Sequence, residues 1–123
     1  MTEPLALVFY ERLLPGSQLV NRLQDLGYRV QTVPEITALG STAASAGALV
    51  VFADLQTTEA DIATALAQLK QAAATKHLPV IAFADDKHTE LQAAARLVGI
   101  TVVDDALLLA HLGQLLEQAL QLD

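Results

Sequence analysis

The chain has 123 residues, of which 53% are hydrophobic and 17% are charged, and its formal net charge is −7. This length suggests one domain over residues 1–123, and the apolar content excludes a disordered chain. The sequence contains no cysteine, which excludes disulfides and thiolate metal sites. Its seven basic residues are scattered and form no basic patch, so the negative charge argues against nucleic acid as a partner.

Targeting signals are missing from the sequence. No apolar run reaches the roughly 18 residues that a membrane span needs. The start, Met-Thr-Glu-Pro, lacks the basic residues of a signal peptide. We therefore expect a cytoplasmic protein that does not act at a membrane and whose partners are other proteins.

The first part of the chain alternates between apolar runs and segments with helical spacing. Leu5–Phe9 is a continuous apolar run and predicts a strand. A turn at residues 15–17 then precedes a helix that we expect to end at Gly27. Alternating residues over Tyr28–Val33 predict a second strand. The small and polar residues of Gly40–Gly47 favour a frayed helix or a mobile surface loop.

The second part of the chain continues the alternation. Ala48–Ala53 is hydrophobic on both faces, which is typical of a central strand in a parallel sheet, and Asp54 follows it. Leu78–Ala84 and Ile100–Val103 predict two further strands, with helical segments before and after them. Five strands alternating with helices predict an α/β fold, since right-handed crossovers place helices on both faces of a parallel sheet. We expect a three-layer α/β/α sandwich of flavodoxin-like type, with a five-stranded parallel sheet of order 2-1-3-4-5.

Acidic residues follow several of the predicted strands. In such a sheet the carboxyl ends of the strands meet at one edge, where ligands and chemistry gather. That edge would bring Glu11 and Asp54 together with the Asp85-Asp86 region. Two carboxylates there could hold Mg²⁺, or they could be helix caps and solvated charges. The histidines lack metal-ligand spacing, and there is no nucleophile elbow or glycine-rich phosphate loop.

Three short motifs give the chain a family resemblance over nearly its whole length. They are Leu-Gly-Tyr at 26–28, Asp54-Leu55 after an apolar strand, and Leu-Pro-Val-Ile-Ala at 78–82. With the five-fold alternation, these motifs make the chain resemble the receiver domains of bacterial two-component response regulators. The resemblance implies the same flavodoxin-like fold and a role in signal transduction.

The family's phosphorylation site carries over only in part. The resemblance places the phospho-accepting aspartate on Asp54, which is retained. The acidic pair that binds Mg²⁺ falls on Tyr10 and Glu11, so its first member is lost. The switch Thr or Ser after the fourth strand falls on Ala84, which has no hydroxyl. Glu11 and Asp54 leave two carboxylates, from which we expect at most weak Mg²⁺ binding.

The last strand departs from the family as well. The Lys expected after it falls near Asp104 or Asp105, and the aromatic switch residue falls near Val102. Phosphoryl transfer depends on neutralising the transferring oxygens, and an Asp near the Lys position would repel them. The resemblance therefore implies a degenerate receiver, or pseudo-receiver.

Three functions remain open at this point. The first is a non-enzymatic signalling module that acts through protein–protein contacts without phosphorylation. The second is an atypical receiver in a phosphorelay, which accepts a phosphoryl group on Asp54 from a histidine kinase. The third is a small-molecule-binding or enzymatic flavodoxin-like protein, for which no motif speaks.

The end of the chain suggests self-association. A final helix, capped by Asp104 or Asp105, is expected to run to about Leu122. Besides one apolar stripe, it carries a second stripe, made up of Leu109, Leu116 and Leu120. A surface helix needs only one stripe for its own core, and a surplus apolar patch marks an interaction surface. We therefore expect a homodimer through these leucines, with a wide buried helix face as the alternative.

Overall fold

The structure is a computed structural model of the whole chain. It describes residues 4–33, 38–56, 62–73, 75–85, 87–97 and 100–120, and the side chains of all of these except positions 14, 46, 63 and 120.

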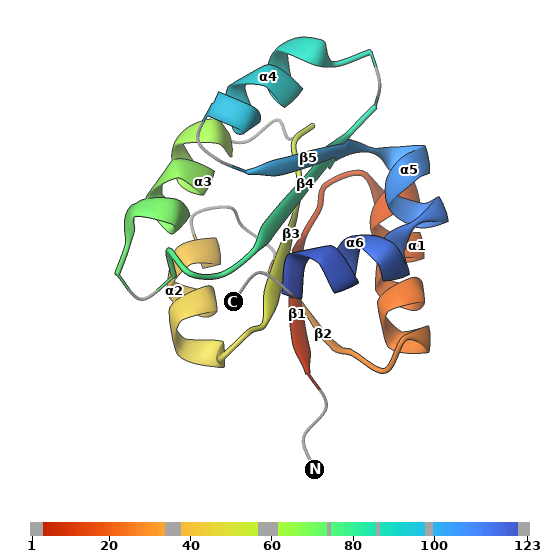
Figure 1. Cartoon of the computed structure of the whole chain (residues 1–123), viewed down its shortest axis with the longest axis horizontal. Coiled ribbons are helices and arrows are strands. Elements are labelled where there is room, and N and C mark those ends of the chain that lie inside the picture. The colour runs from red at the N-terminus through yellow and green to blue at the C-terminus, as the bar shows by residue number, and fades with distance from the viewer. Residues whose placement is uncertain are drawn as a thin grey trace.

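A parallel β-sheet forms the centre of the molecule (Figure 1). Its strands are β1 (Leu5–Phe9), β2 (Arg29–Thr32), β3 (Val50–Asp54), β4 (Val80–Ala84) and β5 (Thr101–Asp104). They lie in the order β2-β1-β3-β4-β5, and every neighbouring pair is parallel. The predicted flavodoxin-like topology is confirmed. The three inner strands are buried at every position, because helices cover both faces of the sheet.

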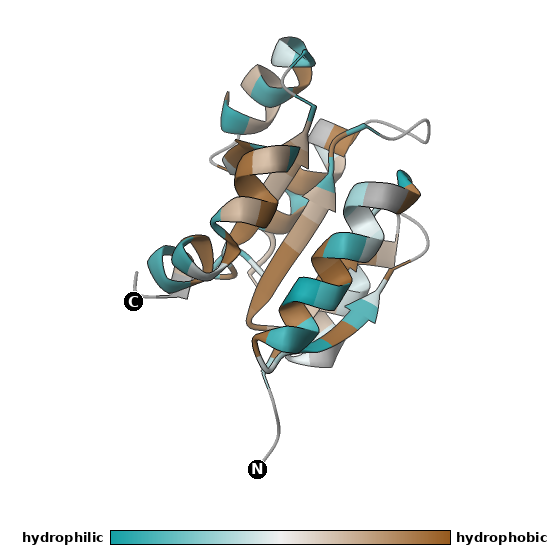
Figure 2. Ribbon diagram, turned by 90° about the vertical axis from the view of Figure 1, so that its right-hand side faces the viewer, coloured by the Kyte–Doolittle hydropathy of each residue, from teal (hydrophilic) through white to brown (hydrophobic). Residues whose placement is uncertain are grey.

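Helices form the two outer layers. They are α1 (Leu13–Asp25), α2 (Leu39–Ala46), α3 (Ile62–Gln71), α4 (Thr89–Leu97), α5 (Asp105–Ala110) and α6 (Leu112–Leu120). One apolar cluster joins one face of the sheet to α2, α3 and α4, and a second joins the other face to α1, α5 and α6. Figure 2 shows apolar strands inside and hydrophilic residues on the outer sides of the helices. Within the described ranges, no helix is long and apolar enough to cross a membrane.

The expected frayed helix or loop over Gly40–Gly47 is a regular helix, α2. Leu39 and Ala43 lie one turn apart and are both buried against the sheet, which gives this segment an apolar face in spite of its small residues. The helix ends at Gly47, whose φ of 71° is the left-handed conformation common at helix C-termini. The interpretation as a mobile loop is therefore wrong.

The first helix begins earlier than the sequence predicts. It starts at Leu13, so Pro15 lies in its first turn and is not part of a preceding turn. Proline is tolerated there because the first N–H groups of a helix have no acceptor within the helix. The predicted end is confirmed, since α1 stops at Asp25 and Gly27 follows with a φ of 92°.

The single C-terminal helix of the prediction is two helices. The backbone leaves the helical conformation at His111, with φ −125° and ψ 28°, and α6 begins at the next residue. The predicted cap is confirmed, because the Asp104 carboxylate accepts the backbone N–H of Leu107 at 2.8 Å. Leu108 of α5 and Leu112 of α6 are both buried in the same apolar cluster. The break therefore redirects the chain and keeps both helices on the sheet.

Leu109 and Leu116 of the second leucine stripe do not form an exposed surface. Leu116 is only 4% exposed and belongs to the core beneath α6, and Leu109 is half-buried against the same cluster. The side chain of Leu120 lies outside the described part. The prediction of an exposed stripe is thus wrong at Leu116, because α5 and α6 bury a wide apolar face. The homodimer itself stays a prediction.

Candidate functional site

The carboxyl ends of the strands bring most of the predicted site residues to one edge of the sheet. Tyr10 and Glu11 follow β1, and Asp54 is the last residue of β3. Ala84 and Asp104 end β4 and β5, where they are register partners. Asp86 lies outside the described residues. The topology therefore assembles the expected edge, and the contacts within it decide what this edge can do.

The carboxylate of Asp54 is fully buried, at 0% exposure, and both of its oxygens accept hydrogen bonds. Its Oδ2 accepts the backbone N–H groups of Glu11 at 3.3 Å and of Arg12 at 3.1 Å. Its Oδ1 accepts the backbone N–H of Gln56 at 3.0 Å. The guanidinium of Arg12 donates from Nε to both oxygens, at 3.1 and 3.3 Å, and from Nη2 to Oδ1 at 2.9 Å. Such partners offset the cost of burying a carboxylate.

Arg12 also binds a second carboxylate, that of Asp105 at the start of α5. Nη1 donates to Oδ2 at 2.7 Å and Nη2 donates to Oδ1 at 3.1 Å, which is a bidentate pair. The side chains of Arg12 and Asp105 are 25% and 26% exposed. Burial lowers the pKa of Arg12, but hydrogen bonds to Asp105 and Asp54 raise it by more, so this pKa lies above its usual value. Arg12 is therefore a permanent positive charge between two carboxylates.

Two more contacts anchor the first loop of this edge. The guanidinium carbon of Arg12 lies 5.9 Å from the ring centre of Phe83 on β4. The ring of Tyr10 is half-buried and lies against Gly16 of α1, where a Cβ atom would collide with it. At the position of the first acidic residue, this chain therefore has an aromatic side chain that packs against a helix.

The loop after β4 is bound by amide side chains. Ala84 is fully buried and offers only a methyl group. The Oε1 of Gln56 accepts the backbone N–H of Asp85 at 2.5 Å, and the Nε2 of Gln92 donates to the backbone carbonyl of Asp85 at 3.3 Å. Gln92 is itself buried. The loop is thus held to the segment after β3 and to α4 by the side chains of Gln56 and Gln92.

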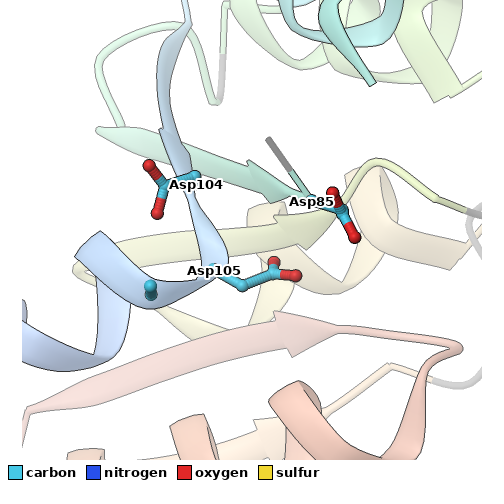
Figure 3. Close-up of a pocket in the computed structure, with 4 residues that line it drawn as sticks. Asp85, Asp104 and Asp105 are labelled. Atoms are coloured by element: carbon cyan, nitrogen blue, oxygen red, sulfur yellow. The ribbon is translucent and has the colours of Figure 1, made fainter. Parts of the chain in front are cut away.

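An acidic pocket of about 340 Å³ opens at the ends of β4 and β5, lined by Asp85, Asp104, Asp105 and Ala106. Figure 3 shows the carboxylates of Asp85 and Asp105 on the same side of the pocket, while that of Asp104 is directed to the opposite side. Asp104 caps α5 and Asp105 binds Arg12, so both carboxylates near the expected Lys position have structural partners. Val102, at the aromatic switch position, is half-buried against the sheet.

The residues present do not fit a tightly held Mg²⁺. This ion takes about six oxygen ligands at roughly 2.0–2.1 Å. Across the described ranges, no group of three or more His, Asp or Glu residues is arranged to hold a metal ion. The Asp54 oxygens that a metal would use already accept N–H groups. Weak binding at Glu11 and Asp54 stays a prediction.

Sequence reasoning missed Arg12. The carry-over of the family pattern ended at Tyr10 and Glu11, and Arg12 is the next residue. A signal was present, because this lone arginine lies at the end of the first predicted strand in a chain with twice as many acidic as basic residues. A cation at that edge has carboxylates as its nearest available partners. The three histidines are exposed.

Comparison with solved structures places the fold among known proteins. No protein-family model matches the sequence, and no curated protein matches it. The receiver domain of the sensor histidine kinase PA1611 from Pseudomonas aeruginosa PAO1 has a TM-score of 0.86 at 16% identity, covering 98% of this chain and 99% of that chain. That structure has a magnesium ion coordinated in its active site cleft.

Two further structures give the same picture. The receiver domain of NtrX from Brucella abortus has a TM-score of 0.82 at 19% identity, covering 96% of this chain and 99% of that chain. The signal receiver domain of an HD domain-containing protein from Pseudomonas fluorescens Pf-5 has a TM-score of 0.83 at 22% identity, covering 98% and 89%. The chain therefore has the fold of response-regulator receiver domains, as its sequence resemblance implied.

Proposed function

We propose that the chain is a degenerate receiver-like signalling module of the cytoplasm, which acts through protein–protein contacts without phosphorylation. One observation carries this proposal: the carboxylate of Asp54 is fully buried, and N–H groups occupy both of its oxygens. A phosphoryl donor must reach a free carboxylate oxygen in line with its leaving group. Asp54 offers no exposed oxygen for this attack unless Arg12 and the first loop move away.

The surroundings of Asp54 support the same proposal. Ala84 cannot hydrogen-bond a phosphoryl oxygen, and no lysine stands at the end of β5, where Asp104 and Asp105 are found. Phosphoryl transfer needs neutralisation of the transferring oxygens, and the cation that pairs with Asp54, Arg12, is already shared by two carboxylates. The partners we propose are signalling proteins, with a histidine kinase as one class, and no catalytic activity of the chain's own.

The second candidate is an atypical phospho-accepting receiver. It is favoured by the position of Asp54 at the carboxyl end of β3, the edge at which β4 and β5 bring Asp85, Asp104 and Asp105 around an acidic pocket. It requires the Arg12 guanidinium to leave Asp54 in exchange for Mg²⁺ and the phosphoryl donor.

Incubation with acetyl phosphate and Mg²⁺, followed by intact-mass measurement, separates the two candidates. We expect no adduct on the wild-type chain after an incubation that labels a functional receiver domain to completion. Asp54→Ala is the matched control, since it removes the acceptor. Near-stoichiometric addition to the wild type that disappears in Asp54→Ala would establish the second candidate and overturn the proposal.

A further inference from the structure

We infer that Arg12 is the resident cation of this edge and takes the place of the divalent metal ion that the receiver fold implies. This inference concerns what neutralises Asp54, and it holds whichever partner the module binds.

The geometry of the guanidinium supports this assignment. Five side-chain hydrogen bonds leave Arg12, three to Asp54 and two to Asp105, with lengths of 2.7 to 3.3 Å. All three guanidinium nitrogens are used, and Nη2 serves both carboxylates. The planar guanidinium can donate two hydrogen bonds to each of two carboxylates. It can therefore connect two carboxylates, as a metal ion can.

The charges also exclude joint occupation by Arg12 and a metal ion. Arg12 cannot ligate a metal because a guanidinium has only donors and does not deprotonate in proteins. A divalent ion at Asp54 would lie within a few ångströms of this positive charge, which is a strongly repulsive arrangement in a buried place. To bind at Asp54, Mg²⁺ must therefore displace the Arg12 guanidinium from that carboxylate.

Arg12 also connects secondary-structure elements that are far apart in the sequence, as a bridging metal ion would. It follows β1, and its two partners lie at the end of β3 and the start of α5, which are 42 and 93 residues away in the sequence. It therefore joins the ends of three elements. In the described part, no buried side-chain nitrogen or oxygen lacks a hydrogen-bond partner, so the arrangement is complete without an added ion.

A double-mutant cycle tests whether Arg12 neutralises Asp54. The variants are Arg12→Gln, Asp54→Asn and the double variant, and urea unfolding gives the unfolding equilibrium constant of each. Arg12→Gln leaves the buried Asp54 carboxylate without its cation, and Asp54→Asn leaves Arg12 with Asp105 as its only carboxylate of the two, whereas the double variant replaces both charges by neutral amides. We expect the double variant to be at least tenfold more stable than the sum of the single effects predicts. If Arg12→Gln fails to fold while the double variant folds, the same coupling is demonstrated. Additive effects would overturn the inference.

A magnesium titration tests whether a metal competes for the same place. The urea midpoint of the wild type is measured with 0 to 10 mM MgCl₂, at an ionic strength held constant with NaCl. Up to 1 mM, below the concentrations at which weak binding at Glu11 and Asp54 would be filled, we expect the wild type and Asp54→Asn to respond equally. A rise in the wild-type midpoint over this range that Asp54→Asn abolishes would show a tightly held metal at Asp54 and overturn the inference. Acetyl phosphate labelling of Asp54 is a separate measurement, so this inference and the proposed function can fail independently.

Discussion

The ring of Tyr10 lies against the backbone of Gly16, so closely that a methyl group at position 16 would overlap the ring carbons. Tyr10 thereby packs the end of β1 against the first turn of α1. Tyr10 precedes Arg12 in the sequence and Gly16 follows it. This packing holds the loop that carries the guanidinium, and it depends on position 16 being glycine.

Gly16→Ala should therefore destabilise the protein. We expect a loss of about 1–3 kcal/mol in the free energy of unfolding, the usual cost of overfilling a packed site, measured by urea denaturation. Gly113→Ala is the matched control, because it is also helical and a Cβ there meets nothing within 4 Å. That control should be neutral or stabilising by up to about 1 kcal/mol. Equal effects at the two positions would argue against the contact with Tyr10.

Leu116→Ala should cost about 2–5 kcal/mol, because it removes a large side chain from the core beneath α6. Leu97→Ala is the control, as Leu97 is 87% exposed and its truncation should change stability by less than about 0.5 kcal/mol. Urea denaturation of both variants gives the comparison. If Leu116→Ala were as stable as the wild type and only altered the sedimentation coefficient, the original exposed-stripe interpretation would be restored.

Gln56→Ala should loosen the loop after β4, because it removes the acceptor of the Asp85 backbone N–H. A lost hydrogen bond of this kind costs about 1 kcal/mol. We expect the exchange rate of the Asp85 amide hydrogen to rise at least several-fold, measured by NMR. Gln68→Ala on the exposed side of α3 is the control and should leave this rate unchanged. An unchanged rate in Gln56→Ala would mean that the amide is protected by other contacts.

Tyr28 should make the protein less stable in alkaline solution. Burial raises the pKa of Tyr28 above its usual value of 10.0, so the folded state keeps the phenolic proton when the unfolded state has lost it. The folded state then binds more protons, and the free energy of unfolding falls as the pH rises above about 10. In Tyr28→Phe this part of the fall should vanish. Parallel pH profiles of the two proteins between pH 8 and 11 would contradict the assignment.

The fold could be predicted from the sequence because the strong patterns are local. The inner strands β1, β3 and β4 are apolar on both faces, and that alone indicates a parallel sheet covered by helices. The prediction failed where packing overrides composition. The small residues of α2 become helical because Leu39 and Ala43 pack against an apolar surface, and Leu112 and Leu116 of α6 are buried because they join the apolar cluster that α1 and α5 form with the sheet.

The candidate site was predictable only as a set of positions. The order of the strands predicts that Asp54 and its acidic neighbours lie at one edge of the sheet. It does not predict which side chain contacts Asp54, so the pairing of Arg12 with Asp54 could not be predicted. The partner of Asp105 could not be predicted from the sequence either. Its repulsion of a phosphoryl group could be reasoned from its charge, but its bidentate pair with an arginine 93 residues earlier is a matter of tertiary geometry.

The spacing of the two ion pairs has a consequence for the speed of folding. Arg12 and its two carboxylate partners are 42 and 93 residues apart in the sequence. Contacts of such separation stabilise the chain only after long loops have been closed, which slows folding. The pair with Asp105 also needs β3 and β4 in place between β1 and β5, so the edge around Arg12 is completed only when the whole sheet has assembled.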